Sequence, residues 1–224
     1  MSRVPLVLSW SGGKDGALAL EALRAGHEYE VIALLTTLSR EHGRISMHGV
    51  RETLLDAQAA ALDLPLRKIW LPENPDNDTY GKAMAAELAA MRNEGVMQVA
   101  FGDLFLEDIR AYRERQLALV GMRGVFPLWK QSTTAIARRF IDRGYRAMLT
   151  CVDTEAIDAA FAGRNYDDRL LRELPPGCDP AGENGEFHTF VYAGPSFRKS
   201  VTVRTGECVL RDGRFQFCDL LPAA

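Results

Sequence analysis

The segment Ser11–Gly16 reads Ser-Gly-Gly-Lys-Asp-Gly and lies between a short apolar run and a helical pattern. Consecutive glycines permit positive φ, which Gly13 is expected to adopt, and they let backbone N–H groups turn inward. Together with the positive end of the following helix, these groups predict a cradle for an anion such as phosphate. The Ser11 hydroxyl adds a donor, and Lys14 adds a compact positive charge suited to phosphate.

Asp15 stands inside this segment, where its carboxylate would repel a bare phosphate. It therefore indicates either a bridging Mg²⁺, which prefers oxygen ligands, or a structural contact to the turn. The spacing fits neither G-x-x-x-x-G-K-[ST] nor G-x-G-x-x-G, so these two nucleotide-binding motifs are excluded. A tight turn that uses glycine for geometry alone is the simpler alternative, but it needs neither the lysine nor the aspartate.

A second polar segment lies far along the chain, where Glu183 and Glu186 flank Gly185 just before an alternating apolar run. Two carboxylates in a glycine-bearing loop can bind Mg²⁺, hold an ammonium or amine, or act as a general base. A solvated acidic turn is the alternative. In the run that follows, His188 is equally compatible with a core position and a catalytic role, and Thr189 can donate a hydrogen bond to substrate.

Two further pairs of residues are candidates for binding the nucleotide or the substrate. Gly102 and Asp103 follow an apolar run at the expected carboxyl end of a strand, where open α/β sheets bind ligands. There the glycine would let the backbone approach a nucleotide, and the aspartate could reach metal or ribose. His48 and Arg51 lie between a glycine-containing loop and a helix, from which they could approach nucleotide or substrate. Ordinary strand-end and surface positions are the alternatives for both pairs.

The chain has 224 residues, and its 27 Lys and Arg against 30 Asp and Glu give a net charge of −3. This mildly acidic balance argues against long nucleic acid as the main partner. No apolar run approaches the ~20 residues that span a bilayer, and no secretion signal is indicated, so we expect a cytoplasmic protein. The four cysteines show no C-x-x-C spacing, which favours reduced thiols over a metal site.

Apolar runs alternate with helical patterns through Val152, which predicts a doubly wound, mostly parallel sheet. The expected strands are Val4–Leu8, Val31–Thr36, Leu66–Leu71, Met97–Phe101, Val125–Leu128 and Ala147–Val152. The expected helices are Ala17–Leu23, Val50–Leu62, Tyr80–Arg92, Leu106–Leu119 and Thr133–Arg143.

The pattern changes after Arg172. Leu174–Glu186 is rich in Pro and Gly and predicts irregular structure. Strands are expected at Phe187–Tyr192, Lys199–Leu210 and Phe215–Leu220, with a hairpin turn at Asp212-Gly213. The chain is therefore expected to end in a smaller α+β portion with antiparallel strands. We place the boundary so that residues 1–128 form a nucleotide-binding domain and residues 129–224 a substrate-binding domain.

Ser11-Gly12-Gly13-Lys14-Asp15 after the first strand resembles the PP-loop of the ATP pyrophosphatases. Within that group the chain resembles the diphthine–ammonia ligase family, whose second motif is E-x-G-E-[FY]-x-T. The matching segment is Glu183-Asn184-Gly185-Glu186-Phe187-His188-Thr189, and the resemblance covers essentially the whole chain. Two positions depart from the family pattern: Gly16 replaces a hydroxyl residue, and Ala181 replaces a cysteine.

The resemblance implies a HUP-like, PP-loop ATPase fold and an ATP-dependent ligase that uses Mg²⁺. A substrate carboxylate would be adenylated, with release of pyrophosphate, and then amidated by ammonia or an amine with release of AMP. The acid would be a small molecule or diphthine on elongation factor 2. A homodimer is expected from base rates alone.

In this interpretation Lys14, Glu183 and Glu186 are catalytic, and Arg51, His188 and Thr189 bind substrate. Asp15 would bind Mg²⁺. The expected nucleotide-binding residues are Ser11, Gly12, Gly13, Lys14, Asp15, Gly16, His48, Gly102 and Asp103. We further expect the segment Glu183–Thr189 to face the Ser11–Gly16 loop across one cleft.

Two other functions stay open. One is a regulatory protein that binds ATP or AMP without turnover, which the Gly16 and Ala181 departures favour. The other is a PP-loop enzyme that modifies tRNA, which the acidic balance and the lack of an evident RNA-binding appendage disfavour.

Overall fold

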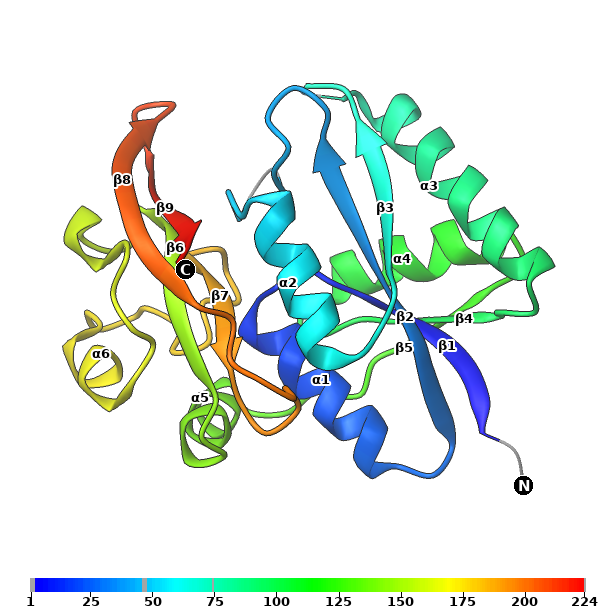
Figure 1. The fold of residues 1–224 in the computed structure, drawn as a ribbon, viewed down its shortest axis with the longest axis horizontal. Coiled ribbons are helices and arrows are strands. Elements are labelled where there is room, and N and C mark those ends of the chain that lie inside the picture. Colours follow the sequence, from blue (N-terminus) through cyan, green and yellow to red (C-terminus); the bar gives the residue numbers. More distant parts are fainter. Residues whose placement is uncertain (1–2, 46–47, 74, 224) are drawn as a thin grey trace. The chain divides into compact units, whose positions relative to one another are not determined.

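A computed structural model describes residues 3–45, 48–73 and 75–223 (Figure 1). The chain forms two compact units, each built from several segments. The first unit comprises Met1–Ser11, Asp15–Gly43 and Leu64–Lys130. The second comprises Gly12–Lys14, Arg44–Asp63 and Gln131–Ala224. No helix in the described ranges is both long and apolar enough to span a membrane.

The first unit contains a five-stranded parallel sheet in the order β3-β2-β1-β4-β5. Its strands are β1 (Val4–Ser9), β2 (Tyr29–Ser39), β3 (Leu66–Leu71), β4 (Gln98–Ala100) and β5 (Arg123–Val125). The strand order reverses direction between β1 and β4, which is where ligands bind in open parallel sheets. The centre of β1 is continuously apolar and at most 1% exposed, as expected for a strand covered on both faces.

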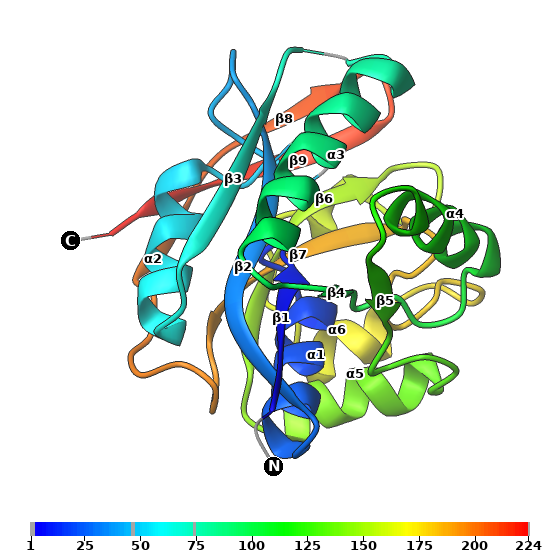
Figure 2. The same ribbon diagram turned by 90° about the vertical axis from the view of Figure 1, so that its right-hand side faces the viewer.

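Three helices complete this unit: α1 (Lys14–Ala25), whose first residue belongs to the second unit, α3 (Asn77–Asn93) and α4 (Glu107–Leu119). Helix α3 packs along β3, and α4 contacts both α3 and β5 (Figure 2). The core between them is built from aliphatic side chains together with Phe101. Its buried members are Val7, Ala33, Leu35, Ile69, Leu71, Leu88, Met91, Val96, Val99, Phe101, Leu117 and Met122.

The second unit contains a four-stranded antiparallel sheet in the order β7-β6-β9-β8. Its strands are β6 (Arg146–Asp153), β7 (Phe187–Ala193), β8 (Val203–Arg211) and β9 (Phe215–Pro222). Its helices are α2 (Glu52–Leu62), α5 (Thr133–Asp142), the short η1 (Ala159–Phe161) and α6 (Asp168–Glu173).

Two features hold the second unit together. Helix α2 packs against β9. The Phe140 ring lies 5.2 Å from the Tyr145 ring and 5.4 Å from the Tyr166 ring, and Tyr166 in turn lies 5.9 Å from Phe187. Aromatic contacts of this kind join α5, the loop before α6 and β7 into one core.

These findings confirm the expected fold class. The Leu174–Glu186 segment contains no regular element, and the β8–β9 turn uses positive φ at Asp212 (52°) and Gly213 (63°), as predicted. The strand expected at Val125–Leu128 instead ends at Val125, two residues before Pro127. Proline has no N–H to donate to a sheet, so the ladder cannot continue through it.

One strand was assigned to the wrong sheet. The run Ala147–Val152 was expected to continue the parallel alternation, but it forms β6, which pairs antiparallel with β7 and β9. An apolar run indicates that a strand is buried but does not indicate which strands it pairs with. Periodicity therefore could not distinguish the two sheets. The expected division at residues 128 and 129 stays a prediction.

The start of α1 constrains the chain just after β4. A Cβ atom added to Gly102 would lie 2.8 Å from the carbonyl carbon of Asp15 and 3.1 Å from the amide nitrogen of Gly16. Both contacts are with backbone atoms, which cannot move aside as a flexible side chain could.

We therefore expect Gly102→Ala to lower the free energy of unfolding by about 1–3 kcal/mol, the usual cost of overpacking. Gly81→Ala in α3 is the matched control, because a Cβ there meets no atom within 4 Å. That change should raise the free energy of unfolding by about 0.5–1 kcal/mol. Urea unfolding measures both. Equal stabilities of Gly102→Ala and the parent protein would contradict the close approach.

Candidate active site

The glycine turn uses positive φ at Gly12, a conformation that glycine adopts readily. Gly12 takes a φ of 83°, and a Cβ added to it would lie 2.9 Å from Oε1 of Gln58. Gly13, which was expected to use positive φ, does not occur among the residues with that conformation in the described chain. The expectation was wrong about which glycine bends the backbone, because spacing alone cannot separate two adjacent glycines.

Hydrogen bonds attach this turn to β7. The N–H of Val191 donates to the carbonyl oxygen of Gly12 (2.8 Å), and the N–H of Lys14 donates to Oγ1 of Thr189 (3.1 Å). The fully buried Gln58 donates from Nε2 to the carbonyl oxygens of Gly12 (3.0 Å) and Val191 (2.6 Å). The two sequence motifs therefore meet within the second unit, although whether they face a common cleft stays a prediction.

Sequence reasoning missed Gln58. The available signal is a single amide in the otherwise apolar stretch of α2, where Leu54, Leu55 and Ala59 are also buried. A polar side chain on the buried face of a helix needs a partner, because an unsatisfied amide is costly there. The sequence could have marked the position as constrained but could not have named its partners.

The Lys14 side chain is deeply buried, with 3% of its surface exposed. Its Nζ lies 5.7 Å from the centre of the Phe187 ring and 6.0 Å from that of Tyr166, within cation–π range. Because little water screens a charge at this depth, the ammonium exerts a strong field on neighbouring groups. The position favours a negatively charged ligand beside Lys14.

Two histidines lie near Lys14. The rings of His48 and His188 are stacked obliquely, with centroids 4.3 Å apart. Burial and then the Lys14 charge lower the pKa of His188 to about 4. Burial, His188 and Lys14 together lower the pKa of His48 well below its usual value, although a hydrogen bond to the backbone of Thr189 opposes this. Both rings are therefore neutral near pH 7.

The Nδ1 atom of His48 is buried and has no hydrogen-bond partner within the described part of the chain. Buried imidazole nitrogens are usually paired, so an orphaned one indicates a missing donor or acceptor. A neutral ring presents one nitrogen as an acceptor, and a small molecule with an N–H or O–H group could supply the donor.

Glu186 organises its own loop. The residue is 6% exposed, and its carboxylate accepts hydrogen bonds from the N–H of Asp179 (2.9 Å), the N–H of Asn184 (3.0 Å) and Nδ2 of Asn184 (3.1 Å). Asp179 accepts in turn from the N–H groups of Ala181 (2.8 Å) and Glu183 (3.3 Å). These bonds give the loop a fixed backbone, and the side chain of Glu183 is only half-buried.

Gly182 is the tightest position in this loop. It has a φ of 64°, and an added Cβ would lie 2.9 Å from the carbonyl oxygen of Phe187. Ala181, which stands where the resembling family has a cysteine, is fully buried. No thiol is therefore present at that point of the loop.

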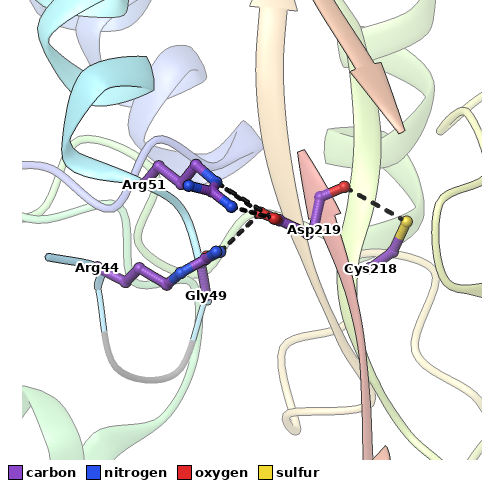
Figure 3. Close-up of polar contacts among 5 residues, drawn as sticks. All are labelled: Arg44, Gly49, Arg51, Cys218 and Asp219. Carbon is purple, nitrogen blue, oxygen red and sulfur yellow. Dashed lines mark hydrogen bonds and ion pairs between the residues drawn. The ribbon is translucent and has the colours of Figure 1, made fainter. Parts of the chain in front are cut away.

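The guanidinium of Arg51, which was expected to bind substrate, forms an ion pair with Asp219 (Figure 3). Its Nε and Nη2 donate to the two carboxylate oxygens of Asp219 at 3.0 Å and 2.5 Å, and Nη1 of Arg44 donates to the same carboxylate at 2.7 Å. Partial burial would raise the pKa of Asp219, but the hydrogen bonds from Arg51 and Arg44 outweigh it and lower the pKa to about 2.

This arrangement, which we call the Asp219 clamp (Arg44, Arg51 and Asp219), holds both ends of the segment that carries His48. Arg44 and Arg51 also form an isolated antiparallel bridge, and Arg44 donates to the carbonyl oxygen of Gly49 (2.8 Å). Substrate binding by Arg51 stays a prediction, but its observed contacts position the histidine segment.

The remaining candidates lie in the first unit. Asp103 accepts from Nε (2.7 Å) and Nη2 (3.2 Å) of Arg113, whose guanidinium lies 4.4 Å from the Phe101 ring centre. Gly102 adjoins the backbone of α1, so the helix accounts for the glycine without a nucleotide. A Cβ on Gly16 would lie 3.3 Å from the Trp10 ring, which leaves limited room for a hydroxyl residue.

Ser11 is half-buried between β1 and α1, and Asp15 lies in the first turn of α1. Among residues 3–45, 48–73 and 75–223, no group of three or more His, Cys, Asp and Glu residues is arranged to hold a metal ion. A single carboxylate together with phosphate oxygens is nevertheless a common way to bind Mg²⁺. The role of Asp15 therefore stays a prediction.

Comparison with known proteins identifies the family. Residues 4–124 match the model of the diphthamide synthase N-terminal domain, and residues 132–218 match that of the diphthamide synthase C-terminal domain. The chain is 24% identical over 221 residues to diphthine–ammonia ligase of Homo sapiens, covering 89% of this chain and 83% of that protein. It is 26% identical over 227 residues to the enzyme of the same name from Danio rerio, covering 89% and 86%.

The two family models together span both sequence motifs and follow the chain in the expected order. They confirm the resemblance drawn from Ser11–Asp15 and Glu183–Thr189. The chain belongs to the diphthamide synthase family of ATP-dependent, amide-forming ligases.

Proposed function

We propose that this protein joins ammonia to a substrate carboxylate in a step of diphthamide synthesis, with cleavage of ATP to AMP and pyrophosphate. The observation that carries this proposal is the attachment of the Gly12–Lys14 turn to β7 by hydrogen bonds to Thr189 and Val191. That attachment brings the anion-binding backbone beside the His188–Thr189 end of the second motif. A ligase needs the phosphate-binding turn and the second motif close together, because the activated acid must react with the amine before water hydrolyses it.

In the first half-reaction the substrate carboxylate attacks the α-phosphate, and pyrophosphate leaves. Lys14 and the first-turn N–H groups of α1 stabilise the charge that develops on the leaving group. Mg²⁺, for which Asp15 is our candidate ligand, would neutralise further phosphate charge when bound. The positive φ at Gly12 sets the direction of the turn that presents these groups.

In the second half-reaction ammonia attacks the acyl carbon, the bond from that carbon to the AMP oxygen breaks so that AMP leaves, and the new ammonium group loses a proton. We assign the proton acceptor to the His48–His188 pair, because a neutral ring has a free nitrogen lone pair and Nδ1 of His48 has no partner among the described residues. The nearby Lys14 charge repels ammonium ion and thereby favours neutral ammonia as the nucleophile.

The carboxylates of the acidic loop take different roles in this proposal. Glu186 is a positioning residue, since its two oxygens accept three hydrogen bonds from Asp179 and Asn184. Glu183 is less buried and is the carboxylate that we assign to the substrate.

Relatives of this chain carry the name diphthine–ammonia ligase. We accordingly propose diphthine on elongation factor 2 as the acid, with a small-molecule acid as the alternative. Pyrophosphate release in the presence of ATP, ammonia and either diphthine-bearing factor or a metabolite extract tests both. ATP binding without pyrophosphate release under any of these conditions would favour the non-catalytic regulatory protein. Release only with tRNA would favour the tRNA-modifying enzyme.

Replacing Lys14 tests the anion site. We expect Lys14→Met to weaken Mg-ATP binding by about 1.5–3 kcal/mol, the range for a charge-assisted contact, while keeping most of the buried side-chain volume. Lys82→Met is the control, because Lys82 is exposed on α3 and forms an ion pair with Asp78 one helical turn away. Calorimetric titration measures both affinities. An unchanged affinity in Lys14→Met would remove the assignment of the phosphate site.

Replacing Glu186 and Glu183 in turn distinguishes a carboxylate that holds the loop in place from one that takes part in the reaction. In Glu186→Gln one accepting oxygen becomes an N–H group that faces another donor, so we expect a loss of about 1–3 kcal/mol in the free energy of unfolding together with slower turnover. ATP affinity should be unchanged. Glu183→Gln should instead keep the stability and lose turnover. If Glu183→Gln turned over normally, Glu183 would have no part in the reaction.

The buried histidines predict how stability depends on pH. Because the pKa of His188 is about 4 in the folded protein and about 6.5 when unfolded, the unfolded chain binds more protons between these values. Stability should therefore fall as pH drops from about 6.5 to 4, with His188 contributing on the order of 3 kcal/mol. Urea unfolding at several pH values measures this slope. His188→Gln should flatten it, and an unchanged slope would contradict a buried neutral ring.

A further inference from the structure

Two cysteines face each other across the β8–β9 hairpin. Cys208 on β8 is the direct register partner of Cys218 on β9, next to a register shift between Thr205 and Cys208. Both thiols are free, as are Cys151 and Cys178. The Cys151 backbone pairs instead with His188 and Phe217, and Cys178 lies in the irregular loop before β7.

The positions of the two thiols suit a covalent bond. Directly opposed residues of antiparallel strands have Cβ atoms about 4.5–5.5 Å apart, and a disulfide needs about 3.5–4.5 Å. Cys208 also contributes to raising the pKa of Cys218, an influence that acts only at short range, so the two thiols lie near each other. Only a small approach of the two strands separates the thiol pair from a disulfide.

The two thiols differ in access. Cys208 is exposed on β8, which is an edge strand of its sheet. Cys218 is 3% exposed, and its Sγ would lie 2.7 Å from a Cβ added to Gly163, so it packs closely over that backbone. Burial, with a smaller contribution from Cys208, raises the pKa of Cys218 to about 12. A reagent in solution therefore meets Cys208 first.

We propose that Cys208 and Cys218 form a redox modification site that takes a low-molecular-weight disulfide and becomes an intramolecular disulfide. The Cys208 thiolate attacks one sulfur of glutathione disulfide, whose S–S bond breaks and releases one glutathione thiolate. Cys218 then loses its proton to solvent and attacks Sγ of Cys208, releasing the second glutathione thiolate. Two protein thiols are oxidised and one glutathione disulfide is reduced to two thiols, which take up the two protons.

The site adjoins the Asp219 clamp. Cys218 directly precedes Asp219, and its Sγ lies 3.8 Å from the Asp219 carbonyl oxygen as a hydrogen-bond donor (Figure 3). Formation of the disulfide removes this S–H donor. It also links β8 covalently to the strand that holds Arg44 and Arg51 through Asp219. The modification therefore acts on the strand that anchors the His48 segment.

The test uses the full-length reduced protein with glutathione disulfide as the probe. We expect two of the four thiols to disappear in a denaturing thiol titration, with an intact mass lower by two hydrogen atoms. Peptide mapping without reductant should find Cys208 joined to Cys218. Cys218→Ser should stop with one glutathione on Cys208, and Cys208→Ser should keep its three remaining thiols. Cys151→Ser and Cys178→Ser are controls that should oxidise like the parent.

The second step has its own signature. Because the pKa of Cys218 lies far above neutrality, the decay of the mixed disulfide should accelerate about tenfold for each pH unit between about 7 and 9. The mixed disulfide can be followed in the parent protein, so this measurement does not depend on any variant folding. A stable glutathione adduct at Cys208, a crosslink to Cys151 or Cys178, or four unreacted thiols would each overturn the proposal.

Discussion

The attachment of the Gly12–Lys14 turn to β7 is the constraint on which the rest of the second unit depends. One backbone bond, one bond from the Lys14 N–H to the Thr189 hydroxyl and the doubly donating Gln58 amide join segments that are 175 positions apart at Lys14 and Thr189. All of these groups are buried or nearly so, and leaving any of them unpaired would cost the full desolvation of that group. The turn therefore takes one arrangement within the second unit.

That arrangement sets the electrostatics of the neighbouring side chains. The same docking that pairs the Lys14 N–H with Thr189 buries the Lys14 ammonium among Phe187 and Tyr166. Its charge, added to burial, keeps His48 and His188 neutral. A cation beside two neutral imidazoles suits an anionic leaving group and an uncharged amine together, which is the pairing that an amide-forming ligase requires.

Two carboxylates in the second unit hold the acidic loop and the His48 segment in place. Glu186 fixes the acidic loop by accepting backbone N–H groups, and Asp219 holds Arg44 and Arg51 at the two ends of the histidine segment. Asp219 keeps its charge because the hydrogen bonds from the two arginines lower its pKa to about 2. Hydrogen-bonded carboxylates of this kind fix the backbone that carries a reacting side chain, and the side chain is then positioned more accurately than it would be on a flexible loop.

The sequence by itself determined the fold class, both polar motifs and the family, because these depend on local periodicity, glycine spacing and residue order. It identified Lys14, His48, His188 and Thr189 as candidates, and the fold brings all four into one unit. Only the tertiary structure decided that β6 joins the antiparallel sheet, that Gln58 holds the turn, and that Glu186 and Arg51 are engaged by their own neighbours. The physical reason is that the pattern of apolar residues indicates which positions are buried. The residues that they contact depend on how distant segments of the chain pack together.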